Sequence, residues 1–181
     1  APEKYGYQFD GWYANAQYTL LYDFNLPVTK DIAIFAKWKT IRHTVQFVDY
    51  DGRVIDTFMI ETGRNAYEPA RPQRVGYSFD RWDKDFTNVH EDLVVRATYK
   101  INSYVVTFET NGGTEVQSVT TEYNTLIEAP YNPSKLGYLF DGWYLNGQFT
   151  GDEFLFDKPI TANTKLYAKW TNNTNIVTFY S

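Results

Sequence analysis

The octet Gly137-Tyr138-Leu139-Phe140-Asp141-Gly142-Trp143-Tyr144 decides the fold, because the chain carries it more than once. Residues 6–13 repeat it as GYQFDGWY, and residues 76–83 hold a degenerate copy, GYSFDRWD. A related tripeptide that ends in an aromatic residue follows each copy. Matching blocks in the same order predict a repeat protein. The signature positions are Gly6, Tyr7, Phe9, Trp12, Gly76, Tyr77, Phe79, Trp82, Gly137, Tyr138, Phe140 and Trp143.

The octet alternates like a β-strand, in which successive side chains point to opposite faces of the sheet. This period puts Tyr138, Phe140 and Tyr144 on one face, which we expect to be the core because such aromatic rings bury a large area. Trp143 is then expected on the other face. The middle copy has Arg81 where the third has Gly142, so we expect position 142 to tolerate substitution.

Composition excludes several classes of function. Aromatic residues make up 19% of the 181-residue chain, and these residues favour pleated sheets. The net charge of −5 argues against nucleic acid as a partner, because nucleic-acid binding needs a basic surface. No apolar stretch has the length of a membrane-spanning helix, so we expect no membrane insertion of this segment. Cysteine is absent, and the chain begins at Ala1 without a Met or a signal peptide, so we expect a fragment of a longer protein.

Alignment of the three copies divides the chain into four parts. Residues 1–38 are the C-terminal part of a first repeat whose opening hairpin is missing, and residues 45–99 are a second, shortened repeat. Residues 105–170 are a third, complete repeat, and residues 176–181 are the opening strand of a further one. Each full repeat consists of a hairpin, a crossing segment, the octet strand, a link and a closing strand. Short connectors join successive repeats.

Catalytic chemistry has little support in the residues. A nucleophile needs an oriented base beside it, and the two histidines, His43 in a connector and His90 in a charged loop, lie in no recognisable motif. Asp49 and Asp51 flank a turn that lacks the later oxygen ligands of a calcium loop. We therefore expect no enzyme, no cofactor and no metal site.

The octet aspartates allow two interpretations. Asp10, Asp80 and Asp141 each precede a tryptophan by two positions on the same predicted face. They could form an acidic, aromatic patch that binds sugars. Alternatively, each carboxylate accepts hydrogen bonds from backbone N–H groups of the adjacent loop, while the tryptophan covers the sheet edge. The second interpretation is the simpler one, because recurrence in every unit follows from the fold itself.

Three aromatic residues in the links after the octet are candidate ligand contacts. They are Tyr18 and Tyr22 in the first link and Phe149 in the third. Exposed aromatic rings there would suit a glycan or protein ligand. Packing of the same rings over their own sheet is the alternative.

Several motifs together resemble one known family. They are V-T-F…N-G-G at 106–113, P-x-K-x-G-Y-x-F-D-G-W-Y at 133–144 and L-Y-A-K-W at 166–170. The chain resembles the Listeria–Bacteroides repeat, the B-repeat type found in internalin B and other bacterial surface proteins. The resemblance implies a β-rich α+β fold of tandem small β-grasp (ubiquitin-like) units arranged as an elongated rod. Residues 126–130 in the crossing segment could supply one short helical turn.

The same resemblance implies a secreted, wall-attached location. We expect a non-catalytic repeat segment that serves as a spacer or stalk and supports adhesion or protein–protein interaction. The rival hypothesis is a carbohydrate- or host-protein-binding module that uses the link aromatics. A further expectation concerns residues 176–181, which could pair head to tail with the incomplete first repeat of another chain, because unpaired strand edges invite partners.

Overall fold

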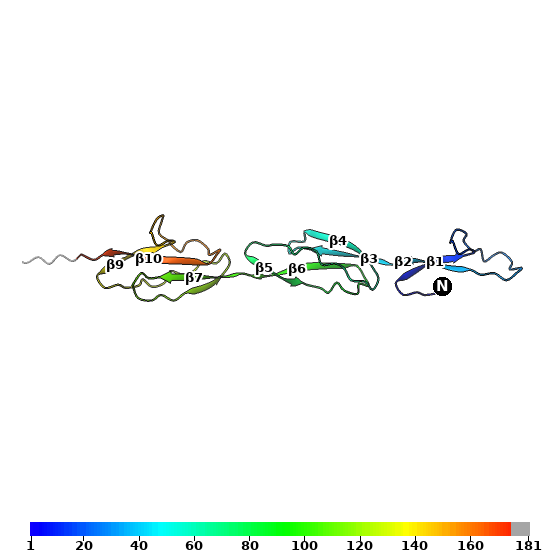
Figure 1. Ribbon diagram of the computed structural model, residues 1–181, viewed down its shortest axis with the longest axis horizontal. Helices are drawn as coiled ribbons and strands as arrows, with labels where there is room; N and C mark the ends of the chain where they lie inside the picture. Colours follow the sequence, from blue (N-terminus) through cyan, green and yellow to red (C-terminus); the bar gives the residue numbers. More distant parts are fainter. Residues whose placement is uncertain (175–181) are drawn as a thin grey trace, which may run out of the picture. The chain divides into compact units, whose positions relative to one another are not determined.

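The computed structural model describes residues 1–174, in which ten strands form three sheets (Figure 1). A two-stranded sheet holds β1 and β2, and two four-stranded sheets have the orders β4-β3-β6-β5 and β8-β7-β10-β9. The strands are β1 Tyr7–Tyr13, β2 Phe35–Thr40, β3 Arg42–Val48, β4 Val54–Glu61, β5 Tyr77–Trp82, β6 Leu93–Ile101, β7 Ser103–Glu109, β8 Val119–Glu122, β9 Tyr138–Tyr144 and β10 Thr164–Asn172.

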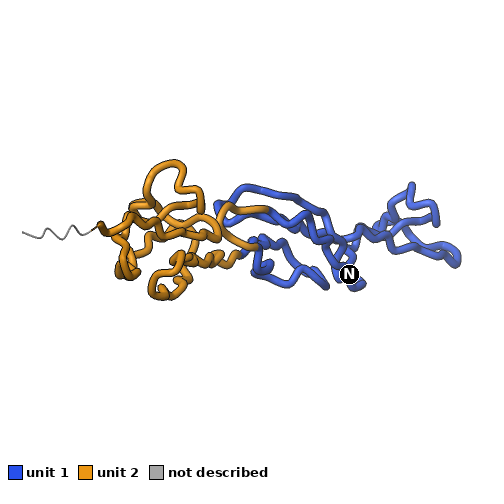
Figure 2. Tube along the Cα trace, turned by 60° about the vertical axis from the view of Figure 1, so that its left-hand side comes forward, with its two compact units in different colours: residues 1–72, 79–98 blue, residues 73–78, 99–181 orange. Residues whose placement is uncertain are grey.

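The chain divides into two compact units (Figure 2). Unit 1 comprises residues 1–72 and 79–98, and unit 2 comprises residues 73–78 and 99–181. The division does not follow the sequence repeats, because the turn before β5 groups with the third repeat. Unit 1 therefore contains the first repeat and most of the second, and unit 2 contains the octet turn of the second repeat together with the third.

Both four-stranded sheets have the same topology. A hairpin opens each sheet, β3 with β4 and β7 with β8, and both pairs are antiparallel. The opening strand then lies parallel to the closing strand, β3 beside β6 and β7 beside β10. The hairpin follows from its turn chemistry, and the crossing segment carries the chain over the sheet to the far edge. The octet strands β5 and β9 occupy that edge.

The predicted α+β class is wrong, because residues 1–174 contain strands and irregular segments but no helix. The fold is all-β, and it is not the expected rod of β-grasp units. Residues 126–130 do not form a helical turn. Proline explains this: it lacks a backbone N–H and holds the preceding residue extended. The crossing segments contain Pro69 and Pro72 in the second repeat and Pro130 and Pro133 in the third.

The expected faces of the octet are wrong for Tyr138 and Trp143, although Phe140 packs against the core and Tyr144 is buried as expected. In β9, Phe140 is paired with Trp170 and Trp143 with Ala168, so two β9 residues face one residue of β10 in a β-bulge. The bulge turns Phe140 and Trp143 to the same side, where their ring centroids lie 5.4 Å apart. Trp143 is buried with 3% of its surface exposed, whereas Tyr138 is 40% exposed. The tryptophan is thus core, and the first tyrosine of the octet is surface.

The core of the third repeat gathers around that tryptophan. Phe108 and Phe140 pack on it from the opening and octet strands. Trp82 occupies the same place in the second repeat and lies 4.9 Å from the ring of Phe47. The buried core residues of the third repeat are Val106, Ile127, Trp143, Ile160, Leu166 and Ala168.

Candidate functional site

A tight turn begins each octet strand. The carbonyl of Lys135 accepts a hydrogen bond from the N–H of Tyr138 at 3.1 Å, and Gly137 between them has φ +81°. A four-residue turn with positive φ at its third position is type II, which favours glycine there. The same bond joins Lys4 to Tyr7 and Arg74 to Tyr77, each at 3.0 Å. The octet glycine is therefore required by the turn geometry.

The cation that opens each turn folds back over aromatic rings. Lys135 Nζ lies 4.5 Å from the ring centroid of Tyr138 and 5.8 Å from that of Trp170. Arg74 covers Tyr77 at 3.8 Å, and Lys4 covers Tyr7 at 4.1 Å. Such cation–π contacts contribute about 0.5–1 kcal/mol at exposed sites. They give the lysine or arginine two residues before each octet glycine a structural role that the sequence analysis missed.

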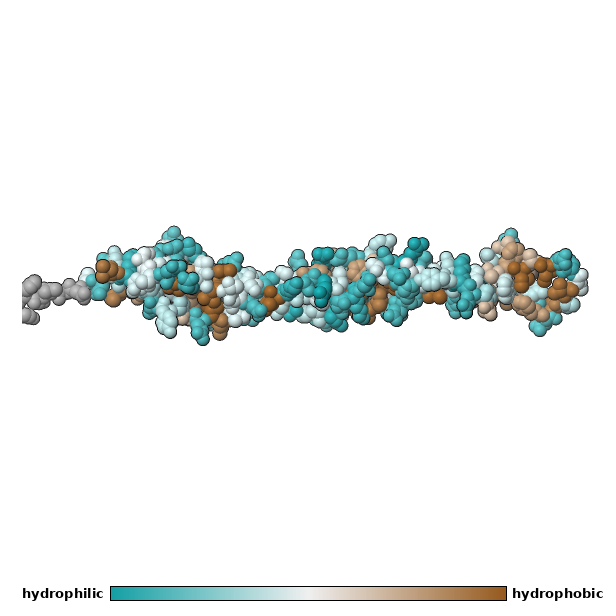
Figure 3. Space-filling model, turned by 90° about the horizontal axis from the view of Figure 1, so that it is seen from below, coloured by the Kyte–Doolittle hydropathy of each residue, from teal (hydrophilic) through white to brown (hydrophobic). Residues whose placement is uncertain are grey.

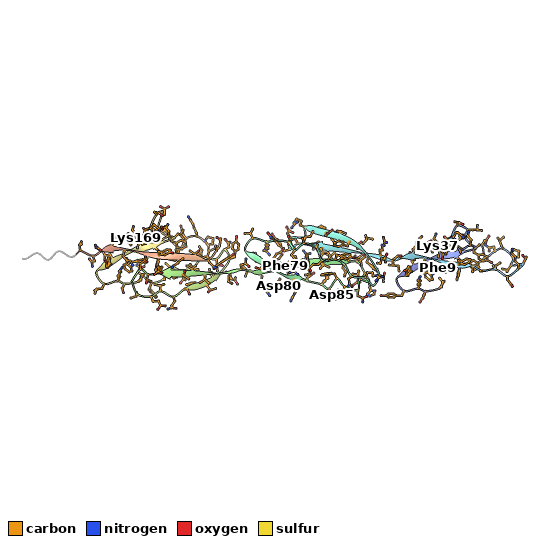
Figure 4. The ribbon with its side chains drawn as sticks, viewed as in Figure 1. Phe9, Lys37, Phe79, Asp80, Asp85 and Lys169 are labelled. Atoms are coloured by element: carbon orange, nitrogen blue, oxygen red, sulfur yellow. The ribbon has the colours of Figure 1, made fainter. Side chains whose placement is uncertain are left out.

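The octet aspartates form ion pairs with the closing strands. Asp141 lies 2.8 Å from Lys169 Nζ, and Asp10 pairs with Lys37 at 3.7 Å and with Lys39. The hydrogen bond that Lys39 donates to Asp10 lowers the pKa of Asp10, and the hydrogen bond that Lys169 donates to Asp141 raises the pKa of Lys169. Figure 4 shows Lys37 and Lys169 on their closing strands. The expectation that these two carboxylates accept hydrogen bonds from backbone N–H groups is wrong, because they pair with lysine side chains instead.

Residues 1–98 contain an ordered junction between the first octet turn and the second repeat. The linker residue Ile41 donates its N–H to the Gly6 carbonyl at 3.0 Å, and its own carbonyl accepts the Thr62 N–H at 3.1 Å. The Tyr5 hydroxyl lies 3.2 Å from His90 Nδ1. The linker is thereby hydrogen-bonded on both sides.

Unit 2 repeats this arrangement with different side chains. Asn102 donates its N–H to the Gly76 carbonyl at 2.9 Å and accepts the Tyr123 N–H at 2.8 Å. The ring of Tyr123 lies against Gly76, since a Cβ added at Gly76 would be 1.9 Å from Tyr123 Cδ1. At the end of the described chain, Asn173 donates to the Gly137 carbonyl at 2.9 Å. The linker bond to the octet glycine thus occurs after every octet.

The link aromatics that were candidate ligand contacts lie against their own repeats. Phe149 contacts Tyr144 edge to face at 5.8 Å, and Tyr18 contacts Tyr13 at the same distance. Tyr22 packs on Phe24 at 4.7 Å, and Tyr18 remains 41% exposed. Figure 3 shows hydrophobic residues gathered over the first link. Tyr18 and Tyr22 belong to unit 1 and Phe149 to unit 2.

The histidines and acidic groups take local structural positions. His43 Nε2 lies 2.9 Å from Thr62 Oγ1 at the unit 1 junction. Asp49 is buried, and its carboxylate accepts hydrogen bonds from the N–H of Tyr50 and from Arg53. Within residues 1–174, no three His, Asp or Glu side chains gather as a metal site would require. Nor does this part of the chain include a helix long and apolar enough to cross a membrane.

The predicted opening strand at 176–181, and with it the head-to-tail pairing, lies outside the described residues. The junctions themselves carry a signal that the sequence analysis passed over. A linker residue follows the last aromatic residue of each closing strand by three positions, as Ile41 follows Trp38 and Asn102 follows Tyr99. The spacing between closing strand and linker residue is constant, whereas the link after the octet varies in length. That constancy indicates an ordered linker.

Comparison with known proteins identifies relatives among bacterial sequences. The chain is 35% identical, over 95% of its length, to a putative membrane protein of Evansella cellulosilytica. It is 34% identical, over 98% of its length, to a putative Gly-rich membrane protein of the same organism. Internalin H of Listeria monocytogenes is 37% identical over 70% of the chain. The chain covers 28%, 22% and 25% of the lengths of these three relatives.

A family model matches most of the chain in three places. The matched segments are residues 1–37, 43–96 and 104–169, and the model describes the Listeria-Bacteroides repeat domain. The resemblance drawn from the octet is thereby confirmed. The chain belongs to the Listeria-Bacteroides repeat family.

Proposed function

We propose that this chain is a non-catalytic spacing segment of a bacterial cell-surface protein. The observation that carries the proposal is the linker hydrogen bonded on both sides, by Gly6 and Thr62 around Ile41 and by Gly76 and Tyr123 around Asn102. A connector held in this way loses the conformational freedom of an ordinary short linker. Ordered connections between successive repeats are what a spacer that presents other domains requires.

The relatives support the location. Their names, two membrane proteins and an internalin, suit a repeat region displayed at the cell surface. Secretion, attachment to the cell wall and a supporting role in adhesion belong to the proposal on the same ground. The aromatic and ionic contacts of the octet serve the fold in this interpretation, which leaves no catalytic role for them.

Hydrogen exchange of single amides tests the spacing role. The N–H groups of Ile41, Thr62, Asn102 and Tyr123 should exchange as slowly as neighbouring strand amides, because each is hydrogen bonded. The amide of Ala16 in the first link, exposed and outside the strands, serves as the fast reference. Junction amides that exchange as fast as Ala16 would show free linkers and contradict the proposal.

The binding-module alternative remains a separate prediction. It requires saturable binding to a glycan or host protein that is lost in Tyr18→Ala, Tyr22→Ala or Phe149→Ala. A glycan array and immobilised host-surface proteins provide the assay. Full retention of binding in all three variants would remove the link aromatics from consideration.

A further inference from the structure

The open edge of the second-repeat sheet is an unusual surface in this chain. β4 is the outermost strand of the order β4-β3-β6-β5 (Figure 1). It is longer than its counterpart β8, with eight residues against four. It contains no proline. Proline at a sheet edge hinders pairing with another strand, so a long edge strand without proline presents unpaired backbone groups that can accept one. The edge of the second repeat is therefore the more accessible of the two.

The backbone of β4 directs specific groups outward. The Thr62 N–H is hydrogen bonded to the Ile41 carbonyl on the β3 side, and the register from Arg42↔Glu61 to Phe47↔Asp56 is unbroken. Because the backbone groups of an antiparallel strand alternate in direction, those of Thr57 and Met59 face the open edge. The Thr57 N–H already donates to Asp56 Oδ1 at 2.8 Å, so Thr57 offers its carbonyl to an incoming strand, and Met59 offers both its N–H and its carbonyl.

A groove of about 920 Å³ lies beside the same edge. Met59 and Tyr67, which are 60% and 75% exposed, supply apolar surface in its lining. Arg42 and Arg64 supply positive charge, and Glu61 pairs with Arg42 at 3.3 Å. Arg64 forms no ion pair or side-chain hydrogen bond with any residue from 1 to 174. The groove thus carries one unmatched guanidinium on a chain whose net charge is −5.

The third repeat lacks this chemistry at the matching positions. Counting from Gly76 and Gly137, Thr120 stands in place of Met59, Thr125 in place of Arg64, and Glu128 in place of Tyr67. The seven arginines of the chain all lie between residues 42 and 96, within the second repeat and the connector before it. The groove is therefore a property of one repeat and not of the shared fold.

We propose that the groove beside β4 binds an extended acidic segment of another protein by strand addition. Main-chain hydrogen bonds to Thr57 and Met59 hold the segment, an apolar residue lies between Met59 and Tyr67, and a carboxylate pairs with Arg64. Strand addition uses backbone bonds for affinity and alternate side chains for specificity. This interaction surface goes beyond the spacing role and does not depend on it.

A synthetic peptide tests the proposal. The probe is an octapeptide of alternating valine and aspartate, with alternating valine and lysine as the charge-reversed control. The acidic peptide should shift the amide resonances of Thr57 and Met59 and leave those of Ser118 and Thr120 unchanged. The lysine peptide, and an acidic peptide with a central proline that blocks pairing, should bind weakly or not at all. Equal binding of the acidic and basic peptides would contradict the proposal.

Substitution with third-repeat residues provides the matched variants. Arg64→Thr should weaken binding of the acidic peptide about fivefold, as expected for an exposed ion pair, and the loss should shrink at high salt. The triple variant Met59→Thr, Arg64→Thr, Tyr67→Glu should lose saturable binding while its far-UV spectrum stays native. Unchanged binding by a folded triple variant would overturn the site. Concentration-dependent dimerisation of the unliganded chain, abolished in the triple variant, would overturn the assigned occupant in favour of a second copy.

Discussion

The second and third repeats share one topology but differ in the local contacts around the octet tryptophan. Trp82 donates its indole N–H to Glu68 at 3.1 Å, whereas the buried N–H of Trp143 has no hydrogen-bond partner in the described structure. Ala129 stands where the second repeat has Glu68. The comparison teaches that the topology depends on the aromatic core and the turn glycine, while the polar contacts around them vary from repeat to repeat.

The bulge in the octet strand shows the same variation. Gly142 has φ +104°, and a Cβ added there would lie 2.4 Å from Glu153 Oε1. Arg81 occupies the corresponding position of the second repeat without a positive φ, and its carbonyl accepts a hydrogen bond from Thr98 Oγ1 at 2.8 Å. The second repeat therefore reaches a similar packing of Phe79 on Trp82, 5.3 Å between centroids, by a different backbone conformation.

The largest expected effect concerns the octet glycines. Gly76→Ala should destabilise unit 2 by about 2–4 kcal/mol, because positive φ costs about 1 kcal/mol and the new methyl group collides with Tyr123. Gly137→Ala is the matched control: its φ is similar, but nothing described lies within 4 Å of the added Cβ. It should cost only about 1 kcal/mol. Urea unfolding measures both.

Tyr123 provides a second check on that prediction. If the collision with the ring is the cause, Tyr123→Ala should relieve most of the additional cost of Gly76→Ala in a double-mutant cycle. Additive effects of the two substitutions would show that the close approach of Tyr123 to Gly76 is unimportant.

The bulge glycine should give the next effect. Gly142→Arg should cost about 1–2 kcal/mol, because a side chain at positive φ is strained and Glu153 must move. This reverses the tolerance expected from the degenerate octet. Arg81→Gly is the control, and should change stability by less than about 1 kcal/mol, the entropic cost of glycine in a strand. Thermal unfolding that ranks the two variants in the opposite order would contradict the difference between positions 81 and 142.

The buried indole provides a prediction in the stabilising direction. An unsatisfied buried donor costs about 1–3 kcal/mol, so a partner for Trp143 should recover part of that free energy. Ala129→Glu places the second-repeat carboxylate in the third repeat and should raise its melting temperature. Ala129→Gln, which retains an acceptor oxygen, should preserve much of the gain, and Ala129→Leu should give none.

The smallest effect is a pH dependence of the octet ion pairs. Because Lys39 lowers the pKa of Asp10, the contribution of the pair is present above the usual aspartate pKa and is lost as the pH falls through the lowered value. Lys169 has a raised pKa, so its contribution is lost only as the pH rises through that value. Carboxyl NMR titration should show Asp10 moving toward its ordinary pKa in Lys39→Gln. An unchanged titration would contradict the ion pair as its cause.

The amino-acid sequence predicts the larger features of this molecule better than the local ones. Recurrence of the octet identifies the repeats and the family, and the Asp-Gly and Asn-Gly-Gly turns indicate the two hairpins. The missing helix could have been anticipated from Pro69, Pro72, Pro130 and Pro133. The faces of the octet could not have been predicted, because the bulge depends on how many residues of β10 lie opposite β9. The groove beside β4 was also beyond reach, since it requires residues 42 and 59–67 to be placed together.

The linker bond to the octet glycine also sets a rule for how such chains can change in length. Both partners of the linker, the turn glycine before it and the hairpin end after it, are backbone groups that any copy of the unit supplies. A duplication or deletion running from one linker residue to the next therefore restores the same bonds, whatever side chains it carries. An insertion of one residue between Trp38 and Ile41 would break them. We therefore expect the gene to gain or lose complete repeats, and we expect variation in length to be confined to the links.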